Sequence, residues 1–263
     1  MHDNRKIGVF DSGIGGLGIL NMLMNKHENE EYLYIADEKN YPYGVRMAEE
    51  IENIVLNVGK KLIQENVKMI IIACNTATAN KSKLEKYCLD NGIKTPIVGV
   101  IEPTARYAAK ATKNKKILVM ATNATINSGL YNKALLEIDN ELSITAVPAS
   151  PLALLVEEGL MGTKIAKAGV KSLLLPYKNI GFDTIILGCT HFDYLSKEIQ
   201  SLFPKARLIS SVDAILPVFE EALIPSSEKK GRVTLCTTSS KDEFLTKVRD
   251  IDKYSSIIEI NVD

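Results

Sequence analysis

The segment Val67–Ala77 reads VKMIIIACNTA, an apolar run that ends in a small residue and a cysteine with a threonine close behind. The chain repeats this arrangement in Phe182–His191, which reads FDTIILGCTH. Both runs have the length of a strand and are rich in β-branched residues, which is typical of buried strands in a parallel sheet. Cys74 and Cys189 therefore follow the carboxyl ends of two strands, the edge of an open α/β sheet at which ligands bind.

The rest of the chain alternates between strand-like and helix-like patterns. Further strands are expected at residues 7–10, 32–37, 97–100, 117–120, 144–148, 207–209, 232–236 and 257–260. Apolar spacing predicts helices at 47–66, 79–89, from 102, from about 126 to 138, from about 151, at 164–175 and 195–202, from 213, and through 244–248. Such alternation predicts an α/β fold with mostly parallel sheets and right-handed crossovers.

The two cysteine strands also mark a weak internal repeat. The separation from Asp11, after the first strand, to Cys74 is close to the separation from Thr122, after the strand at 117–120, to Cys189. We therefore expect two similar domains, each a mostly parallel sheet flanked by helices, with the active site in the cleft between them. The expected first domain is discontinuous and comprises residues 1–98 and 210–263, and the second comprises residues 99–209.

Composition excludes several classes of function. Apolar residues make up 46% of the chain and charged residues 24%, and the 32 basic residues balance the 32 acidic ones, so no net field favours nucleic acid or an acidic membrane. No apolar stretch approaches the ~20 residues of a membrane span, and no signal-peptide pattern precedes the first strand. Four cysteines without framework or CxxC spacing indicate reduced thiols rather than disulfides or zinc. We expect a cytoplasmic protein that binds no metal, nucleic acid or membrane.

A glycine-rich turn follows the first strand. The segment Asp11–Gly18, DSGIGGLG, resembles a phosphate-binding loop, but it lacks the G-x-G-x-x-G spacing and begins with an acidic residue. We favour the alternative that Asp11 and Ser12 present side chains at the sheet edge while the glycines let backbone amides approach a small ligand. The later turn Tyr41–Gly44 suits either a structural turn or a binding loop.

Each cysteine has a neighbour that can accept a proton. Helix N-termini favour the thiolate, and each cysteine follows a strand and precedes a predicted helix. His191 lies two residues after Cys189, so the two side chains share one side if the chain is still extended there. Asp11 can play the same part beside Cys74. Each half of the chain then holds one thiol and one proton-accepting partner.

Two thiols that face one ligand suit the removal of a proton from one face of a carbon and its return to the opposite face. The α-proton of an amino acid is a very weak acid, so amides and hydroxyls must hold the carboxylate where charge develops. The polar residues near the strand ends that can do so are Ser12, Asn75, Thr76, Thr122, Thr125 and Thr190. Cys88 and Cys236 lack such surroundings and are interpreted as buried structural residues.

These motifs together resemble those of glutamate racemases, cofactor-independent enzymes of the aspartate/glutamate racemase superfamily, over nearly the whole chain. The resemblance is carried by Asp11–Gly16, Pro42–Gly44, Ala73–Ala77, Thr122-x-x-Thr125-Ile126, Leu155–Gly159 and Gly188–His191. It implies that Cys74 and Cys189 are the two bases, that Asp11 and His191 assist them, and that Glu157 lies near His191. The substrate site it implies consists of Ser12, Pro42, Tyr43, Gly44, Asn75, Thr76, Thr122, Thr125 and Thr190.

The resemblance further implies that the small-molecule partner is glutamate, that neither pyridoxal phosphate nor a metal takes part, and that D-glutamate supplies peptidoglycan synthesis in a bacterial cytoplasm. A homodimer is compatible with the sequence, which does not determine the oligomeric state. The chain departs from the family pattern at three places: Phe192-Asp193 replaces Tyr-Pro, Ser150 replaces a frequent Cys, and Ala121 replaces Gly. Asp193 adds a charge near His191 and is expected to raise the pKa of the histidine.

Three alternatives stay open at the level of sequence. A sister racemase would act on aspartate or another amino acid by the same chemistry, although the Asp-Ser-Gly and Pro-Tyr-Gly motifs favour glutamate. A Cys-His hydrolase would use Cys189 as nucleophile and His191 as base, but it leaves Cys74 without a function, and neighbours two apart on a strand are poorly placed for such a pair. A non-catalytic protein would bind an amino acid without turnover.

Overall fold

The computed structural model describes residues 2–248 and 250–262. The chain divides into two compact units, Met1–Gly99 with Leu216–Asp263, and Val100–Ile215. The first boundary follows strand β4 (Ile97–Gly99), and the second falls within helix α11 (Ser211–Ala222). No helix in the described ranges is both long and apolar enough to cross a membrane.

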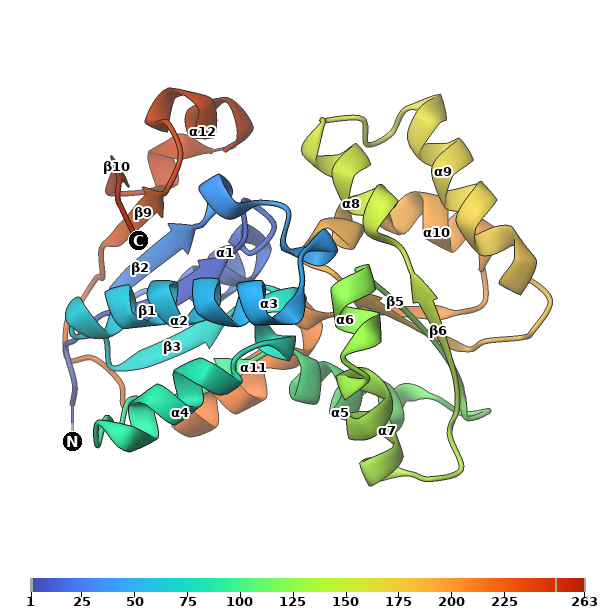
Figure 1. The fold of residues 1–263 in the computed structure, drawn as a ribbon, viewed down its shortest axis with the longest axis horizontal. Helices are drawn as coiled ribbons and strands as arrows, with labels where there is room; N and C mark the ends of the chain where they lie inside the picture. Colours follow the sequence, from blue (N-terminus) through green and yellow to red (C-terminus); the bar gives the residue numbers. More distant parts are fainter. Residues whose placement is uncertain (1, 249, 263) are drawn as a thin grey trace. The chain divides into compact units, whose positions relative to one another are not determined.

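The first unit is built on a parallel sheet (Figure 1). Its six strands lie in the order β10-β9-β2-β1-β3-β4. Besides β4, they are β1 (Ile7–Asp11), β2 (Tyr32–Ala36), β3 (Met69–Ile72), β9 (Val233–Thr237) and β10 (Ser256–Glu259). Every pairing is parallel, and β1, β2 and β3 are buried along their whole length. The carboxyl ends of β1 and β3 therefore lie side by side, which brings Asp11 and Cys74 to one edge.

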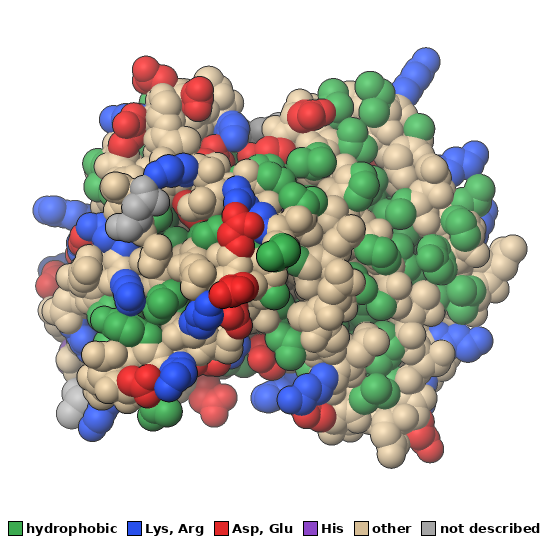
Figure 2. Space-filling view, viewed as in Figure 1, with side chains coloured by type: hydrophobic (Ala, Val, Ile, Leu, Met, Phe, Trp, Pro, Cys, Tyr) green, Lys and Arg blue, Asp and Glu red, His purple; other side chains and the backbone are tan. Residues whose placement is uncertain are grey.

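Helices of the first unit cover this sheet. They are α1 (Leu17–Lys26), α2 (Ala48–Gln64), α3 (Asn75–Ala79), α4 (Ser82–Asp90) and α12 (Lys241–Lys247), with short 3-10 helices η1 (Glu38–Asn40), η2 (Tyr43–Val45) and η5 (Ile251–Lys253). Helix α2 buries one apolar stripe and packs so closely on β1 that a Cβ atom at Gly8 would lie 2.9 Å from Leu62 Cδ2. Acidic and basic side chains are interspersed on the outer surface of α2 and α4 (Figure 2). Among them, Lys83 pairs with Glu52 across the two helices.

The second unit repeats the first on a smaller scale. Its parallel sheet has the order β6-β5-β7-β8, formed by β5 (Lys116–Ala121), β6 (Ser143–Pro148), β7 (Thr184–Gly188) and β8 (Arg207–Ser210). This order corresponds to β2-β1-β3-β4 of the first unit, so the strand before Cys189 is the counterpart of the strand before Cys74. The two parallel sheets, each flanked by helices, confirm the predicted fold class.

Both faces of the second sheet are buried at its two central strands, β5 and β7. The helices of this unit are α5 (Ile101–Ala111), α6 (Asn123–Asn127), α7 (Leu130–Ile138), α8 (Ser150–Glu157), α9 (Lys164–Leu174) and α10 (Ser196–Leu202), with 3-10 helices η3 (Leu175–Tyr177) and η4 (Thr190–Leu195). Leu118 and Leu187 enter one core cluster with α8, α9, α10 and η4, while the alternate residues Val119 and Ile186 are equally buried. Strand β7 is thus fixed from both sides.

The predicted helices differ from the observed ones in four places. The helix expected at 79–89 begins only at Ser82, as α4, because Ala79 ends the preceding helix α3 and Asn80 donates its side-chain amide to Thr76 O at 2.7 Å. The helix expected from about 126 to 138 is divided, because Gly129 adopts a left-handed conformation with φ of 69°. Helix α11 begins two residues before Asp213, and Val248 lies beyond the end of α12. Short polar side chains and glycine interrupt helices where the apolar spacing continues.

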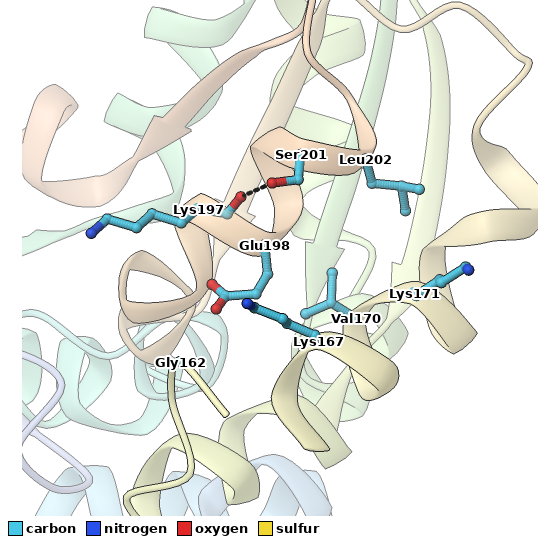
Figure 3. Close-up of a pocket in the computed structure, with 8 residues that line it drawn as sticks. All are labelled: Gly162, Lys167, Val170, Lys171, Lys197, Glu198, Ser201 and Leu202. Carbon is cyan, nitrogen blue, oxygen red and sulfur yellow. Dashed lines mark hydrogen bonds between the residues drawn. The ribbon is translucent and has the colours of Figure 1, made fainter. Parts of the chain in front are cut away.

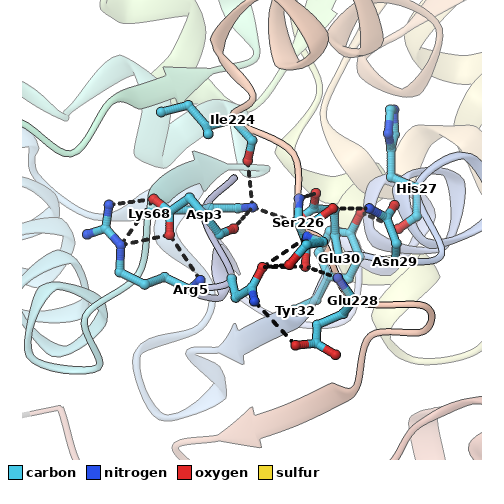
Figure 4. Close-up of polar contacts among 12 residues, drawn as sticks. Asp3, Arg5, His27, Asn29, Glu30, Tyr32, Lys68, Ile224, Ser226 and Glu228 are labelled. Atoms are coloured by element: carbon cyan, nitrogen blue, oxygen red, sulfur yellow. Dashed lines mark hydrogen bonds and ion pairs between the residues drawn. The ribbon is translucent and has the colours of Figure 1, made fainter. Parts of the chain in front are cut away.

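A buried lysine ties distant parts of the first unit together (Figure 4). Lys68 Nζ donates to the carbonyls of Asp3 and Ile224 at 2.6 and 2.7 Å, and it pairs with the Glu30 carboxylate at 2.6 Å. The other oxygen of Glu30 accepts a hydrogen bond from Ser226 N at 2.7 Å. Both charged side chains are almost fully buried. The pair therefore fixes the N-terminal segment and the segment after α11 beside β3, and breaking it would leave a buried charge without its partner.

Candidate active-site residues

Cys74 begins helix α3 as its N-cap residue. The Sγ atom accepts a hydrogen bond from Ala77 N at 3.4 Å, and it lies 3.7 Å from Ser12 Oγ. The side chain keeps some access, because the residue is 6% exposed. A backbone amide that donates to sulfur stabilises the thiolate, so the local structure favours the reactive form of this cysteine.

The glycine-rich turn fixes Asp11 rather than forming a phosphate loop. Asp11 is fully buried, and its Oδ1 accepts a hydrogen bond from Gly13 N at 3.0 Å. Tyr34 OH donates to Gly13 O at 2.7 Å. A Cβ atom at Gly16 would lie within 3 Å of Asp11, Ala73 and Tyr34, so only glycine lets α1 start this close to the sheet edge. Asp11 and Ser12 are therefore held at the edge that carries Cys74.

Asp37 anchors the loop Tyr41–Gly44. From the sequence, this aspartate was predicted only as the last residue of a strand. Tyr43 is 1% exposed, and its hydroxyl donates to Asp37 Oδ2 at 2.5 Å. Asp37 Oδ1 in turn accepts a hydrogen bond from Thr238 Oγ1 at 2.8 Å. Burial, followed by the negative charge of Asp37, holds the pKa of Tyr43 well above its usual range, so the phenol stays a donor. The Tyr41–Pro42 peptide bond is cis.

This loop belongs to the surroundings of Cys74. Helix η2, which contains Tyr43 and Gly44, contacts α3. Asn75 and Thr76 lie in the first turn of α3 and are both 2% exposed. The first unit therefore gathers seven further predicted site residues near Cys74: Asp11, Ser12, Pro42, Tyr43, Gly44, Asn75 and Thr76. A carboxyl residue at the end of a strand, four positions before Tyr41-Pro42, is the sequence signal that would have added Asp37 to them.

In the second unit, Cys189, His191 and Glu157 form a linear chain of polar contacts. Cys189 Sγ lies 3.6 Å from His191 Nδ1, and His191 Nε2 lies 2.8 Å from Glu157 Oε2. The side chains of His191 and Glu157 are 3% and 9% exposed. A carboxylate at this distance accepts the Nε2 proton, which leaves Nδ1 of a neutral imidazole as the acceptor that faces the sulfur.

The Cys189–His191 contact is made by a turn of the backbone, whereas the spacing of the two residues was considered above for an extended chain. The extended conformation of β7 continues through Cys189 and ends there. Thr190 begins the 3-10 helix η4, and Phe192 N donates a hydrogen bond to Cys189 O at 3.0 Å. The condition of an extended chain through His191 is therefore not met, and the two residues do not lie on one strand. A tight turn brings the imidazole back onto the sulfur. Cys189 precedes this short helix and not an α-helix, and its side chain does not cap it.

The remaining predicted residues of the second unit lie around the ends of β5 and β7. Thr122 is the N-cap of α6, where its Oγ1 accepts a hydrogen bond from Thr125 N at 3.3 Å and lies 2.9 Å from Thr125 Oγ1. Thr190 follows Cys189 and is 8% exposed. Because β5 and β7 are adjacent and parallel, the carboxyl ends of these strands bring both threonine sites to one edge. Each unit thus gathers its own share of the predicted residues.

The other two cysteines differ in their surroundings. Burial, with a smaller contribution from Glu85, raises the pKa of the Cys88 thiol. Burial, with Glu65 next, raises the pKa of Cys236 to about 12. Both thiols therefore stay protonated at neutral pH, which agrees with a structural role. All four cysteines are free thiols.

A surface cavity of about 590 Å³ lies in the second unit between α9 and α10 (Figure 3). Its lining combines Val170 and Leu202 with lysines 167, 171 and 197, and none of the predicted site residues contributes to it. Its wall includes a local contact in which Ser201 Oγ donates to Lys197 O at 2.7 Å. The cavity is a separate feature from the cysteine sites.

Comparison with known proteins places the chain in a family. The model of the Asp/Glu/Hydantoin racemase family matches residues 19–217, about three quarters of the sequence. The chain belongs to this family. A curated glutamate racemase of Limosilactobacillus reuteri is 41% identical over 218 residues, which cover 83% of this chain and 78% of that protein.

Solved structures of this racemase family show the same fold over nearly the whole chain. Glutamate racemase isoform RacE1 from Bacillus anthracis has a TM-score of 0.90 at 33% identity and covers 99% of this chain and 98% of that one. Glutamate racemase from Francisella tularensis in complex with D-glutamate has a TM-score of 0.87 at 26% identity, with the same coverage. These likenesses confirm the resemblance drawn from the motifs.

The three departures from the pattern of this racemase family have local explanations. Ser150 Oγ accepts a hydrogen bond from Asn123 N at 2.9 Å, so the hydroxyl supports the start of α6. Ala121 is fully buried at the end of β5, beside Gly188. Burial, with the charge of Asp213 next and a hydrogen bond from Ser210 opposing them, raises the pKa of Asp193 to about 7. The charge expected at Asp193 is therefore only partly present at neutral pH.

Proposed function

We propose that this chain is a cofactor-independent glutamate racemase, which interconverts L- and D-glutamate by two-base transfer of the α-proton. The observation that carries the proposal is the equivalent placement of Cys74 and Cys189 after the corresponding strands β3 and β7, each with its own polar partners. In the cell, the reaction would supply D-glutamate for peptidoglycan in the cytoplasm. The relatives named above carry the same activity in their names.

In the half that holds Cys189, the hydrogen-bond chain defines the direction of proton movement. Glu157 keeps the proton of His191 on Nε2, so Nδ1 accepts the thiol proton of Cys189 and the sulfur becomes a thiolate base. When the reaction runs the other way, the protonated thiol returns its proton to the substrate carbanion. Glu157 acts through His191 and is a positioning residue in this scheme.

In the half that holds Cys74, the sulfur is supported differently. Ala77 N donates to Sγ, and Ser12 Oγ lies in contact with it, so the thiolate is stabilised by neutral dipoles. Asp11 is buried at the adjacent strand end and serves as the proton-accepting partner of Cys74. Two thiols with separate supports allow one to act as base while the other is protonated and acts as acid.

The substrate is held by the polar residues around both thiols. Hydroxyls and backbone amides stabilise the carboxylate and the negative charge that develops on removal of the α-proton. We propose that the substrate site is lined by Ser12, Pro42, Tyr43, Gly44, Asn75, Thr76, Thr122, Thr125 and Thr190. Pro42 has no N–H group and contributes to the shape of the loop, whereas the others can donate hydrogen bonds. The two compact units of the structure act as the two domains of the enzyme, each supplying one thiol. We predict a homodimer, which sedimentation equilibrium would test.

One competing activity fits part of the geometry. The contacts Cys189–His191–Glu157 also have the form of a Cys-His-Glu hydrolase triad. A hydrolase, however, has no use for a second thiol with an amide donor and a hydroxyl neighbour at the equivalent strand end. The hydrolase reading predicts activity that survives Cys74→Ala, whereas the racemase reading predicts that it does not.

The test uses purified protein, L-glutamate and no added cofactor, followed by circular dichroism. We expect loss of optical activity with wild-type protein, and loss of this activity in both Cys74→Ala and Cys189→Ala for both enantiomers. Cys88→Ala is the matched control and should racemise glutamate at close to the wild-type rate. Near wild-type racemisation by either Cys74→Ala or Cys189→Ala would remove that thiol from the mechanism. The same assay with L-aspartate tests the sister-racemase alternative.

A further inference from the structure

A buried cluster of hydroxyl groups lies in the second unit close to Cys189, outside the set of residues assigned above. The Tyr131 hydroxyl, near the start of α7, is hydrogen-bonded to the side chains of Thr104 on α5 and Ser211 on α11. Thr104 Oγ1 donates to Val100 O at 2.6 Å and lies 3.4 Å from Ser211 Oγ. These three side chains come from three helices, and each is at most 3% exposed.

The ring of Tyr131 lies against the residue that precedes Cys189. A Cβ atom at Gly188 would lie 3.0 Å from Tyr131 Cε2 and 2.9 Å from the Ala121 side chain. No side chain therefore fits at Gly188, and the end of β7 is held between the tyrosine ring and β5. Since Cys189 is the next residue, the position of the Tyr131 ring affects the position of the Cys189 backbone and of its thiol.

The phenol itself stays neutral. Burial raises the pKa of Tyr131 most strongly, the hydrogen bonds with Thr104 and Ser211 oppose this effect, and the charges of Glu102 and Cys189 add to it. Because the phenol stays protonated, its hydroxyl remains able to donate a hydrogen bond within the cluster formed with Thr104 and Ser211. The contact with Gly188 and the cluster thus form one rigid connection from α5 and α11 to the strand end.

We propose that Tyr131 is a positioning residue for Cys189: its hydroxyl is fixed by Thr104 and Ser211, and its ring fixes Gly188 and with it the thiol. This inference rests on the proposed racemase function. Loss of the hydroxyl lets the ring shift, so Cys189 abstracts and returns the α-proton less effectively while the residues around Cys74 are unchanged. Tyr131 has no contact with substrate in this role.

The test compares Tyr131→Phe with Tyr177→Phe, a control that removes the hydroxyl of a partly buried tyrosine packed on the core of the same unit. We expect kcat of Tyr131→Phe to fall roughly tenfold, the size of one lost buried hydrogen bond, with KM for glutamate within about twofold of wild type. Thr104→Val keeps Tyr131 itself but removes one hydrogen-bond partner of its hydroxyl, so the ring is held less firmly and kcat should fall in the same way. It provides the second variant if Tyr131→Phe folds poorly, as judged by thermal unfolding.

The primary isotope effect with α-deuterated L- and D-glutamate separates positioning from a general loss of structure. Only one direction begins with abstraction by Cys189, so Tyr131→Phe and Glu157→Gln should raise the isotope effect in that same direction, and Asp11→Asn in the opposite one. Unchanged kcat, or equal changes of the isotope effect in both directions, would overturn the inference. A wild-type protein that does not racemise glutamate would instead contradict the proposed function.

Discussion

Replacing Glu157 by Gln tests the hydrogen-bond chain behind Cys189. The His191–Glu157 contact is 2.8 Å long between side chains that are 3% and 9% exposed, so solvent does little to replace it. Glutamine has the same shape but no charge, and it no longer stabilises the imidazolium that forms when His191 takes the thiol proton. A hydrogen bond to a charged group contributes about 1.5–3 kcal/mol, which corresponds to a roughly 10- to 150-fold loss of kcat.

The assay is steady-state racemisation of glutamate in both directions by circular dichroism. Both directions should slow, because Cys189 takes part in each as base or as acid, whereas KM should change little. The matched control is Glu158→Gln at the next position, where the side chain is exposed and the charge change is the same. If Glu157→Gln keeps kcat within about twofold of wild type, Glu157 does not orient His191 for catalysis. A Glu158→Gln enzyme that is equally slow would show that the effect is not local.

Three further predictions concern separate parts of the chain. Tyr43→Phe removes the donor to Asp37 and should raise KM for glutamate several-fold with a smaller change in kcat, because it loosens a loop assigned to substrate binding; an effect confined to kcat would contradict this assignment. Lys68→Met should lower the free energy of unfolding in urea by about 3–5 kcal/mol, and the double variant Lys68→Met/Glu30→Leu should recover part of the loss; a double variant as unstable as the single one would show that the unpaired charge is not the cause. Burial raises the pKa of Asp193 from 3.8 to about 7, so the folded protein holds a proton that the unfolded chain has released, and wild type loses stability as the pH rises through this window. The melting temperature of Asp193→Asn relative to wild type should therefore increase between about pH 4 and 7 and level off above; a difference that is constant with pH would refute the assignment.

Much of the fold could be predicted because its signals are local. The apolar runs before Cys74 and Cys189 are strands that are buried on both faces, and such strands carry β-branched residues along their whole length. The repeat of strand, polar turn and cysteine strand predicted two similar sheets, and the strand orders agree with it. The family was predicted because six motifs occur in one order, a pattern that a single site would not have provided.

Features that depend on contacts between distant residues could not be read from the sequence. The turn at Thr190 brings His191 onto Cys189, and the spacing of the two residues does not predict this turn. Tyr43 is held by Asp37, and Asp37 is in turn held by Thr238, which lies 201 positions further along the chain. The closeness of Tyr131 to Gly188 follows from the packing of α7 against α5, and the residue types do not predict it. Side-chain partners of this kind are set by the tertiary structure.

In the proposed mechanism, one thiol removes the α-proton from one face of glutamate and the other thiol returns a proton to the opposite face. The most direct measurement is the deuterium content of both enantiomers early in the conversion of L-glutamate in D₂O. We expect the D-glutamate formed to carry deuterium at the α-carbon while the remaining L-glutamate keeps its protium, because the base that abstracts the proton is not the acid that returns one. Equal early deuteration of both enantiomers would indicate a single base. D-glutamate that forms without deuterium would also contradict the two-base mechanism, because the abstracted proton would then have been returned to the same molecule without exchange.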